Sequence, residues 1–259
     1  MYHTMKARYL LVLFALLVAL PQAMNAKKKK EVSIQLYSVR DVINKGTDLN
    51  VVLKDLAEMG YTSIEAANYD NGKFYGKTPE EFKSAVEKAG MTVLSSHCSR
   101  GLSGEEVASG DFSESLKWWD QSIAAHKAAG MKFGYHNHAH EFQKVEDKAV
   151  MLDYMIENTN PEYVFFQMDV YWIVRGQHSP VDYFNKYPGR FTMLHIKDHR
   201  ELGQSGMVGF DAIFNNAKTA GVKNIVAEIE DYSCPVMESV KKSIDYLLEA
   251  PFVKASYSK

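Results

Sequence analysis

The sequence predicts an α/β fold in which parallel strands, covered by helices, form a barrel. From Glu31 onwards, apolar stretches of strand length alternate with amphipathic stretches of helix length. Short connections, several marked by glycine, follow the helices, which is typical of parallel strands joined by right-handed crossovers. Polar and ionisable residues gather where strands end and helices have not yet begun. Barrels of parallel strands carry their active sites at that end.

The elements follow one another in a regular order. The first expected helix ends at Gly60, and Thr78, Pro79 and Glu81 form a capping box that begins the second. The strands look apolar on both faces, as in fully buried parallel sheets. We expect strands at 32–37, 62–67, 92–96, 132–136, 163–168, 191–196 and 224–229, and helices at 47–59, 78–89, 112–129, 148–157, 179–187, 210–220 and 235–248.

These elements make seven βα units instead of the eight of a closed TIM-type (β/α) barrel. The alternative is a doubly wound open sheet, but no glycine-rich phosphate loop follows the first strand. The sequence therefore favours a TIM-type barrel with seven readable units.

Residues 1–26 have the features of a secretory signal peptide. Lys6 and Arg8 precede an apolar stretch at 9–20, and small residues surround Ala26. The stretch is short for a membrane span of about 20 residues, and an uncleaved anchor is the alternative. We expect cleavage after Ala26, a barrel domain at 27–259, and a protein secreted across the inner membrane into the periplasm, with no membrane association afterwards.

Composition narrows the function classes. The 259 residues are 46% hydrophobic, enough for one sizeable core. A net charge of −2 argues against a nucleic-acid partner. Cys98 and Cys234 do not make a disulfide framework, so we expect free, half-buried thiols, with a bridge as the alternative. Nothing in the composition indicates an oligomeric state.

Four predicted strands end close to candidate metal ligands. These are Glu141, Asp169, His195 and Glu228. Consecutive barrel strands would bring them near one axis, and imidazole with carboxylate suits Mn, Zn, Fe or Co. A cation there would polarise a carbonyl and acidify the proton on the neighbouring carbon. As alternatives, Asp169 caps a loop or pairs with an arginine, and His195 is a buried histidine bonded to backbone.

Further polar residues at the same end are candidates for catalysis or substrate binding. Glu230 lies on the same strand face as Glu228, and is a rival ligand. Lys197 shares the face of His195, where it would hold an oxyanion or form a salt bridge. His138 or Glu230 would move a proton. The candidates for contact with substrate, or for support of the site, are Gln35, Arg40, Glu65, His97, His136 and Trp172.

Four motifs carry a resemblance to a known family. Tyr-His-Asn-His-x-x-Glu-Phe at 135–142, Met-Asp-Val-Tyr-Trp at 168–172, Leu-His-Ile-Lys-Asp at 194–198 and Glu-Ile-Glu-Asp at 228–231 resemble the sugar phosphate isomerase/epimerase family. This family belongs to the xylose isomerase-like TIM barrel superfamily, which also contains AP endonuclease family 2 domains.

The resemblance implies a metal-dependent sugar isomerase or epimerase, or a keto-glycoside lyase. It implies one divalent metal ion, with Mn favoured and Zn, Co or Mg possible, held by Glu141, Asp169, His195 and Glu228. Many relatives carry the first glutamate earlier, near His136. The implied partner is a small carbohydrate, and secreted relatives favour a free sugar or keto-glycoside over a phosphate ester.

The sequence departs from the family in one respect. Relatives have a further strand and helix where Gly130 here runs directly into Met131, so we expect one internal βα unit to be absent. A non-catalytic barrel that binds a sugar or a metal is therefore an alternative function. An AP-endonuclease-like phosphodiesterase is less favoured. The resemblance to those enzymes would imply a three-metal site with a histidine three residues after the aspartate, where this chain has Trp172.

Overall fold

The computed structural model describes residues 29–97, 109, 111, 113–114, 117–118, 120–121, 124, 133–142 and 150–258. Contacts divide the chain into Met1–Lys30 and a compact unit, Glu31–Lys259. The predicted signal peptide, most of the predicted helix at 112–129, and Cys98 lie outside the described residues. Cys234 is a free, half-buried thiol. No helix within the described ranges is long and apolar enough to cross a membrane.

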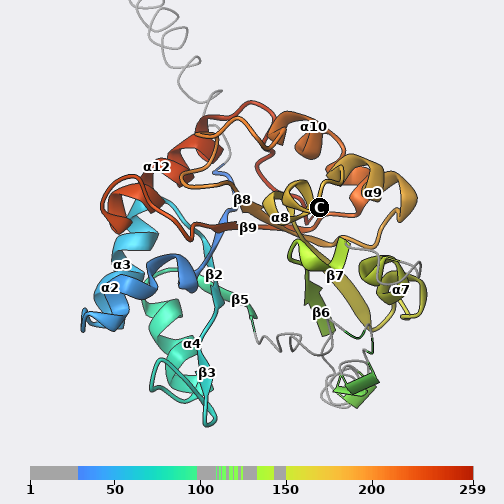
Figure 1. Cartoon of the computed structure of the whole chain (residues 1–259). Coiled ribbons are helices and arrows are strands. Elements are labelled where there is room, and N and C mark those ends of the chain that lie inside the picture. Colours follow the sequence, from blue (N-terminus) through green and yellow to red (C-terminus); the bar gives the residue numbers. More distant parts are fainter. Residues whose placement is uncertain are drawn as a thin grey trace, which may run out of the picture. The chain divides into compact units, whose positions relative to one another are not determined.

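Seven parallel strands form one sheet in the order β5-β2-β1-β9-β8-β7-β6 (Figure 1). They are β1 (Ser33–Gln35), β2 (Ser63–Ala66), β5 (Thr92–Ser96), β6 (Phe133–His136), β7 (Val164–Asp169), β8 (Met193–Lys197) and β9 (Asn224–Glu228). The prediction of a TIM-type arrangement with seven βα units is confirmed. The absent unit stays a prediction, because most of the chain between the edge strands β5 and β6 lies outside the described residues.

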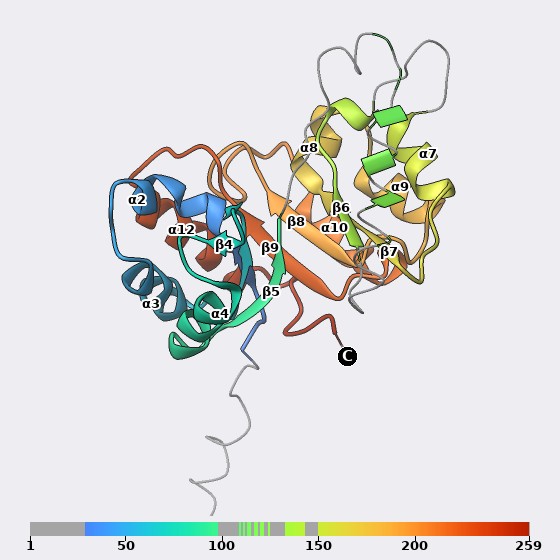
Figure 2. The same ribbon diagram turned by 90° about the horizontal axis from the view of Figure 1, so that it is seen from below.

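Side-chain contacts show that the sheet is curled. The Gln167 amide of β7 donates to Glu65 of β2 over 2.7 Å, although three strands separate β2 from β7 in the sheet. In a flat sheet, four strand spacings would place them roughly 19 Å apart. The helices lie on the outer side of the curl, with α2, α3, α4 and α12 beside the first strands and α7, α9 and α10 beside the later ones (Figure 2).

The two faces of the sheet differ in polarity. Register pairs Gln35 with Glu65, Asp169 with His195, and Lys197 with Glu228, so these side chains share the inner face. The outer face is apolar and packs under the helices, with Ile34, Ile64, Phe166, Met168, Leu194, Ile196, Ile225 and Ala227 each at most 1% exposed. The expectation of strands apolar on both faces is therefore wrong, because the inner face is largely polar.

The helices are α2 (Arg40–Asn44), α3 (Leu49–Met59), α4 (Pro79–Lys88), α7 (Met151–Glu157), α8 (Val170–Arg175), α9 (Pro180–Lys186), α10 (Phe210–Asn215), α11 (Ala217–Ala220) and α12 (Val236–Glu249). The 3₁₀ turns η1 (Leu36–Val39) and η2 (His140–Phe142) and the hairpin β3 (Tyr69–Asp70) with β4 (Lys73–Phe74) complete the described elements.

The predicted capping box is present, with Thr78 and Glu81 bonded reciprocally at the start of α4. The sequence did not predict α2, the two 3₁₀ turns or the β3–β4 hairpin. It also did not predict two further features. The helix expected at 210–220 is divided at Asn216, and α8 follows β7 directly.

Gly221 provides a test of how tightly the outer layer is packed. It ends α11 with φ +85°, and a Cβ there would lie 2.8 Å from the backbone Cα of Gly189. We expect Gly221→Ala to destabilise the fold by more than about 2 kcal/mol, since left-handed backbone alone costs about 1–2 kcal/mol. Gly46→Ala is the control, because Gly46 has φ +95° with nothing within 4 Å. Equal losses in urea unfolding would contradict the packing argument.

Candidate metal centre

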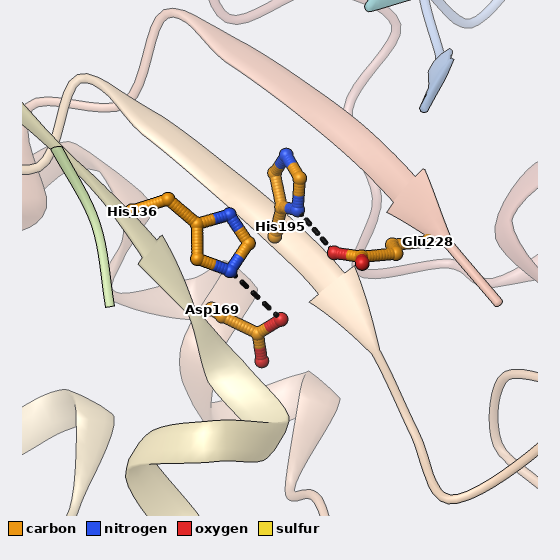
Figure 3. A group of neighbouring side chains, drawn as sticks. All are labelled: His136, Asp169, His195 and Glu228. Carbon is orange, nitrogen blue, oxygen red and sulfur yellow. Dashed lines mark hydrogen bonds and ion pairs between the residues drawn. The ribbon is translucent and has the colours of Figure 1, made fainter. Parts of the chain in front are cut away.

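Four side chains from consecutive strands meet at the carboxyl end of the sheet. His136 ends β6, Asp169 ends β7, Glu228 ends β9, and His195 lies two residues before the end of β8. One potential ligand atom from each lies within 4.8 Å of the others. Figure 3 shows the two rings and two carboxylates turned toward one another. The sequence and the strand register therefore place two imidazoles and two carboxylates around one point.

Asp169, His195 and Glu228 were predicted as ligands, whereas His136 was predicted to contact substrate. The fourth predicted ligand, Glu141, is not in this group. Its carboxylate accepts from the Tyr135 hydroxyl at 2.7 Å and the His138 amide at 2.8 Å. Glu141 lies in η2, beyond the strand, whereas His136 is the last strand residue. Position at the strand end was the signal in the sequence that favoured His136.

Asn137 joins β6 to β7 beside the group. Its side-chain oxygen accepts from the Asp169 amide at 3.1 Å, and its side-chain nitrogen donates to the Asp169 carbonyl at 3.4 Å. Asp169 in turn caps α8, where Oδ1 accepts from the amides of Tyr171 and Trp172. Asp169 Oδ2 is left facing His136 Nε2 at 3.5 Å. The capping alternative for Asp169 thus holds for one oxygen and leaves the other for the group.

His195 lies between two carboxylates. Its Nδ1 is 2.5 Å from Glu228 Oε2, and its Nε2 is 2.8 Å from Glu65 Oε1. Burial alone lowers the pKa of His195, but the charges of Glu65 and Glu228 outweigh burial and raise it to about 10. The same pairing holds the pKa of Glu65 and Glu228 below the ordinary glutamate value, against the effect of burial. The alternative of a histidine bonded only to backbone does not describe this residue.

The polar atoms of the group fit a divalent cation. Within the described part of the chain, both ring nitrogens of His136 and Oδ2 of Asp169 are buried without a hydrogen-bond partner. Such atoms are costly unless a ligand satisfies them. Burial and then the Glu228 charge raise the pKa of Asp169 to about 7. Imidazole with carboxylate is the donor set that Mn, Zn or Co accepts.

An ion pair lies next to the group. It joins Lys197, the last residue of β8, to Glu230, two residues after the end of β9. Lys197 Nζ is 2.7 Å from Glu230 Oε2, and Lys197 is 2% exposed. The nitrogen also lies 5.7 Å from the centre of the Trp172 ring. The indole nitrogen of Trp172 is buried without a hydrogen-bond partner among the described residues. Burial and then Glu228 raise the pKa of Glu230 to about 7.

Histidine rings extend from the group toward the solvent. His138 stacks on His136 with ring centres 5.0 Å apart, and the Trp172 ring lies 5.8 Å from His138. Burial and then His136 lower the pKa of His138 to about 4. His97, the residue after β5, approaches His136 edge-on with ring centres 5.0 Å apart. His97, His136, His138 and Trp172 are therefore brought together, as candidate site residues should be.

The remaining predicted residues lie below or beside the group. Gln35 and Glu65 are buried beneath His195 and bonded to each other at 3.0 Å. Arg40 lies at the rim, where it donates to the carbonyls of Tyr37 and Glu230 and to the Tyr232 hydroxyl. Two residues not singled out from the sequence, Ser95 and Gln167, also donate to Glu65. The sequence signal that could have found them is strand alternation, which places Gln167 on the same face as Asp169.

Comparison with known proteins decides the family. The model of the xylose isomerase-like TIM barrel family matches residues 103–250, more than half of the chain. The chain belongs to this family. A sugar phosphate isomerase/epimerase from Parabacteroides distasonis ATCC 8503 is similar to this family member with 31% identity and a TM-score of 0.73, covering 87% of this chain and 100% of that one. A second structure from that organism, also called a sugar phosphate isomerase/epimerase, has 30% identity and a TM-score of 0.73, with 89% and 97% covered.

More distant structures share the fold alone. D-psicose 3-epimerase from Clostridium cellulolyticum H10 is 11% identical with a TM-score of 0.60, covering 83% of this chain and 97% of that one. No curated protein matches the chain.

Glu201 connects the loops that follow β8 and β9 in this xylose isomerase-like barrel. This buried carboxylate follows β8 and accepts from the amide and hydroxyl of Ser233, which follows β9, at 2.9 and 2.8 Å. Burial alone raises the pKa of Glu201, but the bonds from Ser233 outweigh burial and lower it to about 2. The bonds therefore stabilise the fold while Glu201 is ionised.

This contribution should depend on pH. Because the folded pKa is below the ordinary value of 4.5, the stabilisation is present above about pH 4.5 and is lost as pH falls toward about 2. We expect Glu201→Gln to cost about 1–3 kcal/mol at pH 6, and the difference from wild type to narrow at pH 3, measured by urea unfolding. Glu58→Gln, on the exposed face of α3, should show no such trend. A pH-independent difference for Glu201→Gln would contradict the assignment.

Proposed function

We propose that this protein is a divalent-metal-dependent enzyme of the sugar isomerase/epimerase type, which removes a proton next to the carbonyl of a sugar or keto-glycoside. One observation carries the proposal. Buried nitrogens of His136 and a buried oxygen of Asp169, without hydrogen-bond partners in the described residues, converge with His195 and Glu228. Membership of the xylose isomerase-like family, and two relatives called sugar phosphate isomerase/epimerases, support the reaction class.

His136, Asp169, His195 and Glu228 would hold the ion. A divalent cation bound there supplies Lewis acidity, which polarises a substrate carbonyl and acidifies the proton on the adjacent carbon. The donor set suits Mn, Zn or Co, with Mg less well matched to imidazole, and Mn is the ion we favour.

The neighbouring residues would bind substrate and move the proton. Glu230 would accept the proton from carbon at its carboxylate and return it to the neighbouring carbon on the same face in an isomerisation. In an elimination, the electron pair of the broken C–H bond would expel a leaving group. Epimerisation would need a second residue to protonate the opposite face. Lys197, 2.7 Å from Glu230, would orient that carboxylate and donate to a substrate oxygen. The Trp172 indole N–H is a second donor, and His138, stacked over His136, is the alternative proton carrier.

The surrounding charges favour an uncharged sugar over a phosphate ester. The Arg40 guanidinium donates hydrogen bonds to two backbone carbonyls and to the Tyr232 hydroxyl. Lys197 is paired with Glu230. A phosphate group would have to compete with these partners for both cations, whereas an uncharged sugar can pack against the half-buried Trp172 ring.

Metal content is the first test. Purified wild-type protein should contain about one divalent ion per chain, because the four side chains provide one site. Asp169→Asn and His195→Ala should each lose the ion, and Asp211→Asn, on the exposed side of α10, should keep it. Elemental analysis measures the ion, and a thermal melt of each variant shows whether it is folded.

Two results would contradict the metal proposal. One is retention of the ion in both site variants. The other is a wild-type protein that melts cooperatively but binds no added divalent ion, which would favour a sugar-binding barrel without catalysis.

Proton exchange tests the reaction. In D₂O, the metal-loaded protein should catalyse exchange of the carbon-bound proton next to the carbonyl of a keto-sugar or keto-glycoside, followed by NMR. Glu230→Gln should slow exchange by about 10²–10⁴-fold, because the amide cannot accept the proton, while metal content is unchanged. Asp231→Asn, the exposed neighbour, is the control. Equal exchange in Glu230→Gln and wild type would remove Glu230 from the proposed reaction.

A further inference from the structure

We propose that Glu65 is a positioning residue for the metal centre. Its carboxylate accepts a hydrogen bond from His195 Nε2–H, which keeps the proton on that nitrogen and leaves the lone pair of Nδ1 for the cation. The inference rests on the proposed function only in requiring that the centre binds a metal ion. It deepens that function by assigning a task to a buried carboxylate of β2, a strand that contributes nothing to the four-residue group.

The two carboxylates beside His195 stand on different sides of its ring. Glu228 belongs to the group of potential ligands and lies 2.5 Å from Nδ1. Glu65 lies outside the group and is 2.8 Å from Nε2. A neutral imidazole binds metal through one nitrogen and carries its proton on the other. The nitrogen next to Glu228 is therefore the ligand, and the one next to Glu65 carries the proton.

Glu65 is held so that it can accept but not move. Its Oε1 accepts from Gln35 at 3.0 Å and faces His195, while its Oε2 accepts from Ser95 at 2.6 Å and Gln167 at 2.7 Å. An ionised carboxylate has about four lone-pair positions, and these four donors fill them.

Complete occupation excludes other roles for this side chain. Glu65 is 1% exposed, and a carboxylate with every acceptor position used is available neither as a fifth ligand nor for contact with substrate. A carboxylate that accepts from a metal-bound histidine raises the basicity of that ligand and fixes its ring, and its loss typically weakens metal binding 10–100-fold.

The first test is the protonation of His195 in the wild-type protein. With Zn²⁺ bound and histidine ¹⁵N-labelled, NMR should show His195 protonated at Nε2 and metal-bound at Nδ1. A proton on Nδ1 with zinc on Nε2 would overturn the proposal. So would a wild-type protein that binds no Zn²⁺ or Mn²⁺, which would also overturn the proposed function.

The second test compares two variants of the same hydrogen-bonded layer. Glu65→Gln should weaken Zn²⁺ and Mn²⁺ binding by about 10–100-fold in titrations of EDTA-treated protein, and should reduce the rise in melting temperature that metal produces. Ser95→Ala removes a donor to Glu65 but keeps the bond to His195, and its affinity should stay within about threefold of wild type.

The outcomes separate a positioning role from a structural one. If Glu65→Gln lowers the melting temperature in EDTA but binds metal as wild type does, Glu65 is structural only and the proposal fails. If metal binding weakens as expected but no sugar exchanges its proton, the assignment of Glu65 stands and the proposed reaction fails.

Discussion

The hydrogen bonds of Glu65 are the constraint on which the rest of the structure depends. Donors from β1, β5, β7 and β8 converge on this one carboxylate of β2. Strands that are separated by up to three others in the sheet can meet in this way only if the sheet curls. An unpaired carboxylate in a buried interior is costly, so the bonds and the curvature stabilise each other. The polar contacts of the inner face set the curvature of the sheet, and the helices pack on its apolar outer face.

The same inner face extends into the candidate site without interruption. Along β8, alternate residues place Met193 against Gln167, then His195 between Glu65 and Glu228, then Lys197 against Glu230. The site therefore consists of layers: a hydrogen-bonded interior, then buried His136 and Asp169 atoms that have no hydrogen-bond partner among the described residues, then an ion pair near the rim. Rigid support below and unsatisfied atoms above are the arrangement expected of a preorganised site.

Much of this was predictable from the sequence, and the exceptions have physical reasons. The alternation of apolar and amphipathic segments predicted the seven strands, because buried apolar segments and glycines at helix ends are local signals. Position at a strand end identified Asp169 and Glu228 as candidate ligands. Glu141 was favoured as a ligand because it lies just past a predicted strand, yet its carboxylate turns back to Tyr135. The polar inner face was missed, because hydrophobicity averaged along a strand conceals an alternation in which Gln35, Glu65 and Gln167 share one side.

The candidate centre does not depend on the βα unit that the sequence predicts to be absent. All four candidate ligands come from β6, β7, β8 and β9, which are contiguous in the sheet. The unit predicted to be absent would lie between β5 and β6, outside that contiguous set. β6 is an edge strand of the described sheet, and Asn137 compensates by bonding to both backbone groups of Asp169. The Tyr-His-Asn-His motif thus joins an edge strand to its neighbour at the point where His136 must be held, and the geometry of the centre does not require a closed barrel.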